Sequence, residues 1–119
     1  MFHLPAAELK CVMLFNGERY LTIKGIAHRL DVAKSRVTKI VQGLMEKGLV
    51  DRIDDPRDSR IKLIRLTGDG MRKFREISDF KISIHRKILM QMNPEERRQT
   101  LSYLEVLRSA MEAVKESMV

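Results

Sequence analysis

The sequence predicts a mainly α-helical fold that contains one small β-hairpin. Two observations carry this prediction: apolar residues recur at helical spacing in five segments, and two short alternating segments lie between the third and the fourth of them. A chain of 119 residues, 44% of them apolar, is long enough to bury a core. We expect one compact unit without a flexible linker, with one functional region in residues 1–70 and another in residues 71–119.

Two short helices open the chain. The first begins at Pro5, whose fixed φ suits a first helical turn, and ends before the stop signal Asn16-Gly17. The second begins after Thr22, whose hydroxyl can cap a helix, and ends near Asp31. Their apolar faces consist of Leu9, Val12 and Met13 in the first helix and Ile23, Ile26, Ala27 and Leu30 in the second.

The third helix, residues 34–47, has two chemically different faces. Gly48 ends it, because glycine adopts the left-handed conformation of a C′ residue without a Cβ clash. The apolar face carries Val37, Ile40, Val41 and Leu44. The opposite face is polar and basic, so we expect it to remain in solvent.

A β-hairpin is expected next. Residues 49–53 and 61–66 alternate between apolar and polar side chains, as half-buried strands do. Residues 54–60 are charged and rich in turn-forming types, which suits a loop and not a buried element. They predict a polar tip between the two strands.

Two longer helices complete the chain. Thr67 can cap the fourth helix, which ends before Asn93-Pro94. Asn93 can then cap the last helix, with Pro94 in its first turn. The apolar stripe of the fourth helix includes Met71, Phe74, Ile77, Ile84 and Ile88.

The last helix is apolar on two faces, and such a helix usually has two neighbours. One face follows the alternating three- and four-residue spacing of a heptad seam, and the other forms a second strip. The seam is Leu104, Leu107, Met111, Val114 and Met118, and the strip is Tyr103, Val106, Ala110 and Ala113. We expect one neighbour to be the preceding helix and the other a second copy of the chain, so that residues 71–119 form a dimerisation region. The alternative is a helix buried entirely within its own domain.

The second and third predicted helices, joined by a tight turn and with a polar basic face on the later one, match a helix-turn-helix, and the hairpin directly after them adds a wing. In this arrangement Arg and Lys can donate to guanine, Gln to adenine, and hydroxyls to phosphates. The candidate DNA-binding residues are Thr22, Lys34, Ser35, Arg36, Thr38, Lys39 and Gln42 on the helices and Arg57, Asp58 and Arg60 in the wing. A basic helix face alone is more often a solvated surface, but the adjacent hairpin favours DNA binding.

The distribution of charge agrees with this interpretation. The chain has a formal net charge of +7, and residues 22–65 hold eleven basic and six acidic side chains. Most of the excess positive charge therefore lies over the predicted third helix and wing, which favours a polyanionic partner such as double-stranded DNA.

Residues from about 21 to 76 resemble the DNA-binding core of the MarR (multiple-antibiotic-resistance regulator) family. The matching residues are Leu21-Thr22, Ile26-Ala27, Leu30, Ser35, Val37-Thr38, Leu44, Lys47-Gly48-Leu49-Val50, Asp58-Ser59-Arg60 and Leu66-Thr67. The spacing Asp-x-Arg and then Leu-Thr after five residues is much more specific than a generic helix-turn-helix pattern. The resemblance implies a cytoplasmic, homodimeric transcriptional regulator, a repressor released by a small-molecule effector, that binds a pseudo-palindromic operator.

The resemblance also implies roles for individual residues. Arg60 corresponds to the wing arginine that enters the minor groove, and Asp58 to the acid that orients it. A narrow A·T-rich minor groove attracts a guanidinium, whereas an exposed turn ion pair without this role would contribute little. In the third helix, Arg36 is the best candidate for reading a base. The phosphate candidates are Ser35, Thr38 and Lys39, with Arg57 a weaker one.

The chain departs from the family pattern at its start. Family members usually carry an extra N-terminal helix that contributes to the dimer interface and the effector pocket, yet only four residues precede Pro5. We expect either a short version of the fold or a sequence that lacks this helix.

Other classes of function find little support. There is no nucleophile elbow, phosphate loop or carboxylate pair to indicate an enzyme, and no cofactor is expected. His3, His28 and His85 are too widely spaced to predict a metal site. Cys11 lies in an apolar stretch, where a thiol is usually buried and structural. No apolar run approaches the roughly 20 residues of a membrane span, and no secretory signal is visible.

One alternative remains open. A winged helix can serve as a protein-interaction module that binds DNA weakly or without specificity. Such a module needs neither a basic helix face nor a wing arginine, so the combination of that face with Arg60 favours the DNA-binding regulator.

Overall fold

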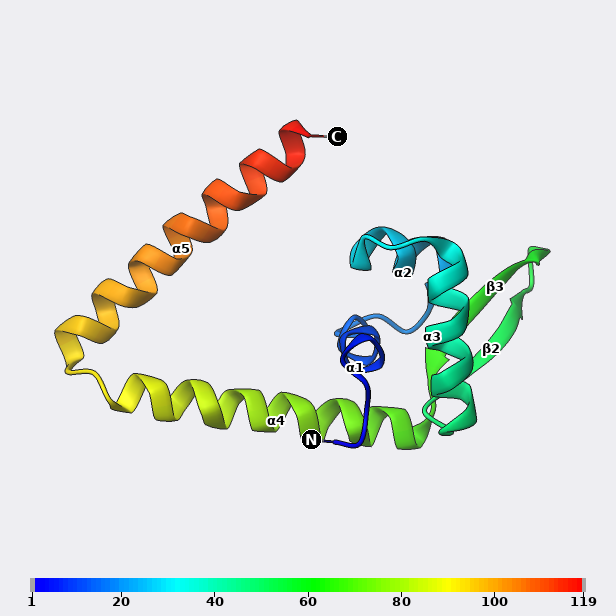
Figure 1. Ribbon diagram of the computed structural model, residues 1–119, viewed down its shortest axis with the longest axis horizontal. Helices are drawn as coiled ribbons and strands as arrows, with labels where there is room; N and C mark the ends of the chain where they lie inside the picture. The colour runs from blue at the N-terminus through cyan, green and yellow to red at the C-terminus, as the bar shows by residue number, and fades with distance from the viewer. Residues whose placement is uncertain (1, 119) are drawn as a thin grey trace. The chain divides into compact units, whose positions relative to one another are not determined.

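The computed structural model describes residues 2–118, which form five helices and three strands (Figure 1). In chain order these are α1 (Ala6–Met13), β1 (Leu21–Thr22), α2 (Ile23–Leu30), α3 (Lys34–Glu46), β2 (Val50–Asp55), β3 (Asp58–Leu66), α4 (Gly68–Met90) and α5 (Pro94–Ser117). The predicted fold class is confirmed: the protein is mainly α-helical, with a winged helix-turn-helix followed by two long helices. The chain divides into two compact units, residues 1–79 and 80–119, which are described separately.

The sheet of the first unit has three antiparallel strands in the order β1-β3-β2. The third strand, β1, was not predicted: Leu21 pairs with Ile64, directly before the helix that Thr22 caps. Two residues are too few to show an alternating pattern, so sequence periodicity could not identify this strand.

The hairpin of β2 and β3 is confirmed, but its tip is shorter than predicted. Asp55 pairs with Asp58, so the turn comprises only Pro56 and Arg57. The Asp55 carboxylate accepts a hydrogen bond from the Arg57 backbone N–H at 2.8 Å, which closes the turn locally. The strands therefore continue through most of the charged segment 54–60 that was predicted to be loop.

The helix ends follow the capping residues of the sequence. The Thr22 hydroxyl accepts from the Gly25 N–H at 2.9 Å, and Gly48 is left-handed with φ of +72°. Asn93 and Glu96 form a reciprocal capping box at the start of α5. These predicted helix boundaries are thus confirmed.

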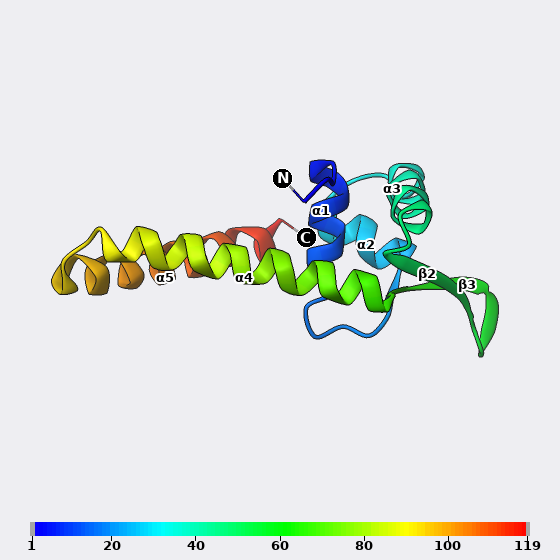
Figure 2. The ribbon, with the colours of Figure 1, turned by 90° about the horizontal axis from the view of Figure 1, so that it is seen from below.

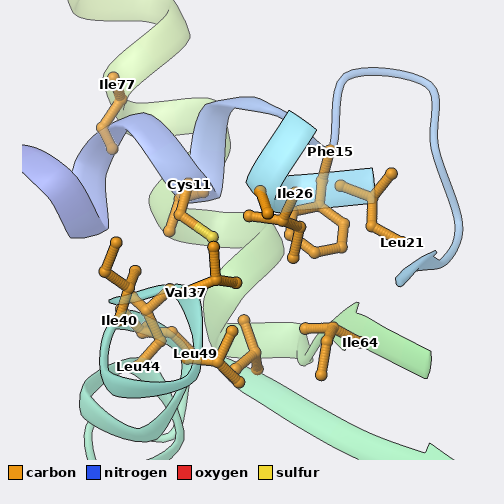
Figure 3. Close-up of a cluster of buried hydrophobic side chains, with 14 residues drawn as sticks. Cys11, Phe15, Leu21, Ile26, Val37, Ile40, Leu44, Leu49, Ile64 and Ile77 are labelled. Atoms are coloured by element: carbon orange, nitrogen blue, oxygen red, sulfur yellow. The ribbon is translucent and has the colours of Figure 1, made fainter. Parts of the chain in front are cut away.

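The core of the first unit collects apolar side chains from α1, α2, α3, the sheet and the first half of α4 (Figure 3). Val37, Ile40, Val41 and Leu44 of α3 all lie in it, as the periodicity predicted. Each fully buried side chain of this size stabilises the fold by roughly 1.5–3 kcal/mol. Burying this face of α3 fixes which side chains the helix presents to solvent.

Thr67 ties the base of the wing to the start of α4. Its hydroxyl donates to the Gly48 carbonyl at 2.6 Å and accepts from the Gly70 N–H at 3.0 Å. Its backbone N–H donates to the Leu49 carbonyl at 3.0 Å. A Cβ at Gly70 would lie 2.0 Å from that same carbonyl oxygen, so the approach of α4 requires glycine.

The second unit contains the end of α4 and all of α5. No residue of α5 within the described part of the chain is buried, and its large apolar side chains are exposed on both strips. None of the helices within residues 2–118 has the length and hydropathy needed to cross a membrane.

Candidate nucleic-acid interface

The solvent side of α3 presents a row of polar and basic side chains, here called the recognition face. Its members, all exposed, are Lys34, Ser35, Arg36, Thr38, Lys39 and Gln42. They project outward because the other side of the helix is fixed in the core.

Two members of the recognition face make hydrogen bonds within α3. The Thr38 hydroxyl donates to the Lys34 carbonyl at 3.1 Å, and the Gln42 amide donates to the Glu46 carboxylate at 3.4 Å. In contrast, Arg36 and Lys39 form no ion pair within residues 2–118. Their donors are available to an external acceptor, which is what reading a base or a phosphate requires.

The hairpin of β2 and β3 projects past α3, away from α1 and α2 (Figure 1, Figure 2). Asp58 and Arg60 lie near its tip. The Arg60 guanidinium donates two parallel hydrogen bonds to the Asp58 carboxylate, at 3.0 and 3.1 Å, and the Arg60 backbone N–H donates a third at 3.0 Å. The Arg60 side chain is nevertheless 89% exposed.

This bidentate pair fixes a charged group in solvent. The guanidinium lowers the pKa of the Asp58 carboxyl, and the carboxylate in turn raises the pKa of Arg60. Both groups are therefore charged at neutral pH, and the planar guanidinium is held in one orientation beside the recognition face.

Two further ion pairs follow β3 toward the base of the wing. Lys62 donates to Asp54 at 2.5 Å and also to the Ser59 carbonyl at 3.2 Å, and Arg65 lies 3.5 Å from Asp51. All the cations of β3 thus have a carboxylate partner. Such exposed pairs contribute little to stability, but they reduce the positive field of the wing.

A small groove of about 270 Å³ lies between the start of α2, the start of α3 and the wing; we call it the phosphate groove. Its lining consists of Thr22, Ile23, Lys24, Lys34, Arg60, Ile61 and Lys62. The fold brings together three of the predicted DNA-binding residues here, Thr22, Lys34 and Arg60. Sequence reasoning missed Lys24 and Lys62, because only the pairing of β1 with β3 places them beside α3.

The remaining predicted residues occupy other positions. Ser35, Arg36, Thr38, Lys39 and Gln42 lie along the recognition face, and Arg57 lies in the two-residue turn at the tip of the hairpin. The predicted dimerisation residues Leu104, Leu107, Met111, Val114 and Met118 belong to the second unit, where all five are exposed.

A second cavity in the first unit, of about 570 Å³, lies where α1, the base of the wing and the start of α4 meet. It is lined by apolar residues that include Phe15, Met71 and Phe74. Its charged lining consists of the cations Arg19, Arg65 and Arg75 and the carboxylates Glu18 and Asp51. Its volume and mixed lining fall in the range of small-molecule sites. We call it the basal cavity.

Cys11 is fully buried in the core between α1 and its neighbours (Figure 3). Burial raises the pKa of its thiol to about 12, and the charge of Glu8 adds to the effect. Within residues 2–118, no three His, Cys, Asp or Glu side chains are grouped as a metal site would require.

Comparison with known proteins shows which family this geometry resembles. A family model described as MarR family matches residues 12–61, a segment that contains the helix-turn-helix and the wing up to Arg60. Over these residues the chain resembles the MarR family.

Two of the similar proteins are named as HTH-type transcriptional regulators or repressors. The uncharacterised HTH-type transcriptional regulator YfiV of Bacillus subtilis is 26% identical over 108 residues, which are 91% of this chain and 68% of YfiV. The HTH-type transcriptional repressor MdtR of the same organism is 30% identical over 92 residues, 77% of this chain and 59% of MdtR. The chain spans about two thirds of the length of the first curated relatives it matches.

A solved structure has the same fold. FabT of Streptococcus pneumoniae, crystallised in complex with DNA, superposes with a TM-score of 0.84 at 22% identity. The match covers 94% of this chain and 78% of the FabT chain.

Proposed function

We propose that this chain is a sequence-specific repressor that binds a pseudo-palindromic operator as a homodimer and releases it when a small molecule binds. One observation carries the proposal: α3 presents the unpaired cations Arg36 and Lys39 beside a wing on which Arg60 is held in a fixed orientation. This arrangement supports two different DNA contacts, one by α3 and one by the wing, on the same surface of the first unit.

The geometry supports different DNA contacts for α3 and for the wing. With α3 in the major groove, the Arg36 guanidinium can donate two hydrogen bonds to a guanine, and Gln42 can pair with an adenine once it leaves Glu46. Arg60 suits a narrow, A·T-rich minor groove, because its orientation is set by Asp58 before binding. Ser35, Lys34 and Lys39 are suited to phosphates.

Thr38 takes a more limited role than the sequence suggested. Its hydroxyl hydrogen is already used on the Lys34 carbonyl, so the side chain can accept a hydrogen bond from DNA or offer its methyl group to a thymine. Donation to a phosphate would require it to break that bond.

The homodimer follows from the exposed strips of α5. A helix with two apolar strips in solvent needs a partner, and the heptad-like spacing of Leu104, Leu107 and Met111 suits a second helix. A two-fold axis through this interface would give two winged helices, which read half-sites about one helical turn or a multiple of it apart.

The basal cavity is the site that we propose for the effector. It lies against Asp51 and Arg65 at the root of the hairpin and against the first turns of α4. A ligand bound there would change the position of the wing relative to the rest of the first unit. If the ligand-bound protein has a lower affinity for DNA than the ligand-free protein, ligand binding releases the operator. Action on chromosomal DNA places the regulator in the cytoplasm.

The experiment that tests this function is a comparison of binding affinities. Fragments selected from genomic DNA by the full chain are compared with a random duplex of equal length, at fixed salt and over a salt series. We expect the selected fragment to bind at least about a thousandfold more tightly, with a steep fall in affinity as salt rises. Equal affinities for the two would favour the alternative, a winged-helix protein-interaction module.

A further inference from the structure

The phosphate groove contains a lysine, Lys24, that none of the DNA contacts proposed above uses. We propose that it holds a single backbone phosphate of DNA and that Lys24 supplies the principal charge for it, together with Lys34. This inference rests on the proposed DNA-binding function and adds to it a residue, Lys24, that acts by positioning the protein on the duplex.

The charge distribution of the groove points to Lys24. Of its four cations, Arg60 is bound to Asp58, and Lys62 is bound to Asp54 and to the Ser59 carbonyl. Lys24 and Lys34 have no carboxylate partner in the part of the chain that the structure describes. The lining contains no acidic residue. An anion entering the groove therefore meets two cations whose charge is not already neutralised by a carboxylate.

The size and chemistry of the groove select the kind of anion. A volume of about 270 Å³ is below that of typical ligand pockets but accommodates a phosphate with part of its sugar. Ile23 and Ile61 provide an apolar surface for a deoxyribose. The Thr22 oxygen accepts from the Gly25 N–H, which leaves its own O–H able to donate to a phosphate oxygen.

The position of the groove explains what this contact would achieve. One side is the first residue of α3, and the other is the wing strand that carries Arg60. A phosphate held between them would fix the distance of α3 and of Arg60 from one DNA strand. Phosphate contacts set the register and orientation of a protein on the duplex without carrying sequence information, so Lys24 is a positioning residue.

The test measures the salt dependence of DNA binding for Lys24→Gln. The probes are a mixed-sequence 24-bp duplex (~two turns, long enough for a dimer) and a fragment selected from genomic DNA. The matched control is Lys10→Gln, which removes the same charge from an exposed lysine of α1 outside the groove. Lys24→Arg retains the charge. Glutamine has nearly the helix propensity of lysine, so all variants should keep the melting temperature of the wild type.

We expect Lys24→Gln to lower the slope of log affinity against log salt by about 0.9 per protomer, and to weaken binding about fivefold per protomer near 0.15 M salt. Both probes should weaken by the same factor, so the ratio of their affinities stays unchanged. Lys24→Arg and Lys10→Gln should keep the wild-type slope.

Three outcomes overturn the inference. An unchanged slope for Lys24→Gln, with wild-type binding intact, would remove Lys24 from the interface and leave the proposed function standing. A loss confined to the selected fragment would make Lys24 a base-reading residue and not a phosphate contact. Absence of salt-dependent DNA binding by the wild type would contradict the proposed function and this inference together.

Discussion

The orientation of Arg60 is set by one neighbouring residue. The Asp58 carboxylate accepts hydrogen bonds from Nε and Nη2 of the guanidinium and from the Arg60 backbone N–H, yet the side chain stays in solvent. An arginine ordered in this way loses less conformational freedom when it enters a groove than a free one does. The spacing Asp-x-Arg in the sequence thus has a direct geometric counterpart in the wing.

Replacing Arg60 should weaken binding to sites with A·T-rich flanks. We expect Arg60→Ala to reduce operator affinity by roughly 1–3 kcal/mol at fixed salt while the melting temperature is retained, because the side chain is 89% exposed. Fluorescence anisotropy with a labelled operator measures the change. Arg60→Lys, which keeps the charge but not the fork, should recover only part of the loss. Wild-type affinity in Arg60→Ala would exclude the residue from the mechanism.

Cys11 is a structural thiol and not a reactive one. Burial raises the pKa of the Cys11 thiol from an ordinary 9.0 to about 12. Near neutral pH the thiolate of Cys11 is therefore about a thousandfold less populated than that of a free cysteine, and the thiolate is the reactive form. The native chain should therefore react very slowly with a disulfide reagent such as DTNB and should react fully in denaturant. Since Cys11 is the single cysteine, the absorbance reports on it alone. Labelling of the native chain at the rate of a free thiol would contradict the account.

At the scale of elements, the proposed role of α3 depends on how the helix packs. Burial of one side in the core determines which side chains form the recognition face. The position of the first turn of α4 depends on the close approach of Gly70 to the Leu49 carbonyl. That contact brings the first turn of α4 close to the segment between α3 and β2.

Gly70→Ala should destabilise the first unit. A Cβ at this position would overlap the Leu49 carbonyl oxygen, so α4 would have to shift, at a cost of roughly 1–3 kcal/mol in the free energy of unfolding. The matched control is Gly68→Ala in the same helix, where a Cβ meets nothing within 4 Å and stability should be unchanged or slightly higher. Urea denaturation measures the free energy of unfolding of each variant. Equal values for the two variants would contradict a close contact between Gly70 and the Leu49 carbonyl.

Sequence reasoning predicted the elements whose signals are local. Capping at Thr22 and Asn93, the left-handed Gly48 and the apolar side of α3 depend on neighbours in the chain, and each was predicted. The two-residue strand β1 and the shortened turn at Pro56 depend on pairing with a distant strand, and both were missed. The phosphate groove arises from the same pairing, which is why Lys24 had no signal in the sequence.

At the scale of the whole molecule, the two units carry different parts of the proposed function. The first holds the recognition face, the wing and the basal cavity, and the second holds the exposed strips of α5. A single winged helix has only a small interface with DNA, so tight and specific binding is expected from two copies that share one operator. The excess of basic residues between positions 22 and 65 is then presented twice along one face of the duplex.

The most direct measurement is a hydroxyl-radical footprint of the full chain on a fragment selected from genomic DNA. We predict two protected regions related by two-fold symmetry, with centres about 10 base pairs or a multiple of that apart, each flanked by protection of a minor groove. Arg60→Ala should lose the flanking protection and keep the central one. A single protected region, or uniform protection equal to that on a random duplex, would contradict a homodimer that reads its operator with α3 and the wing.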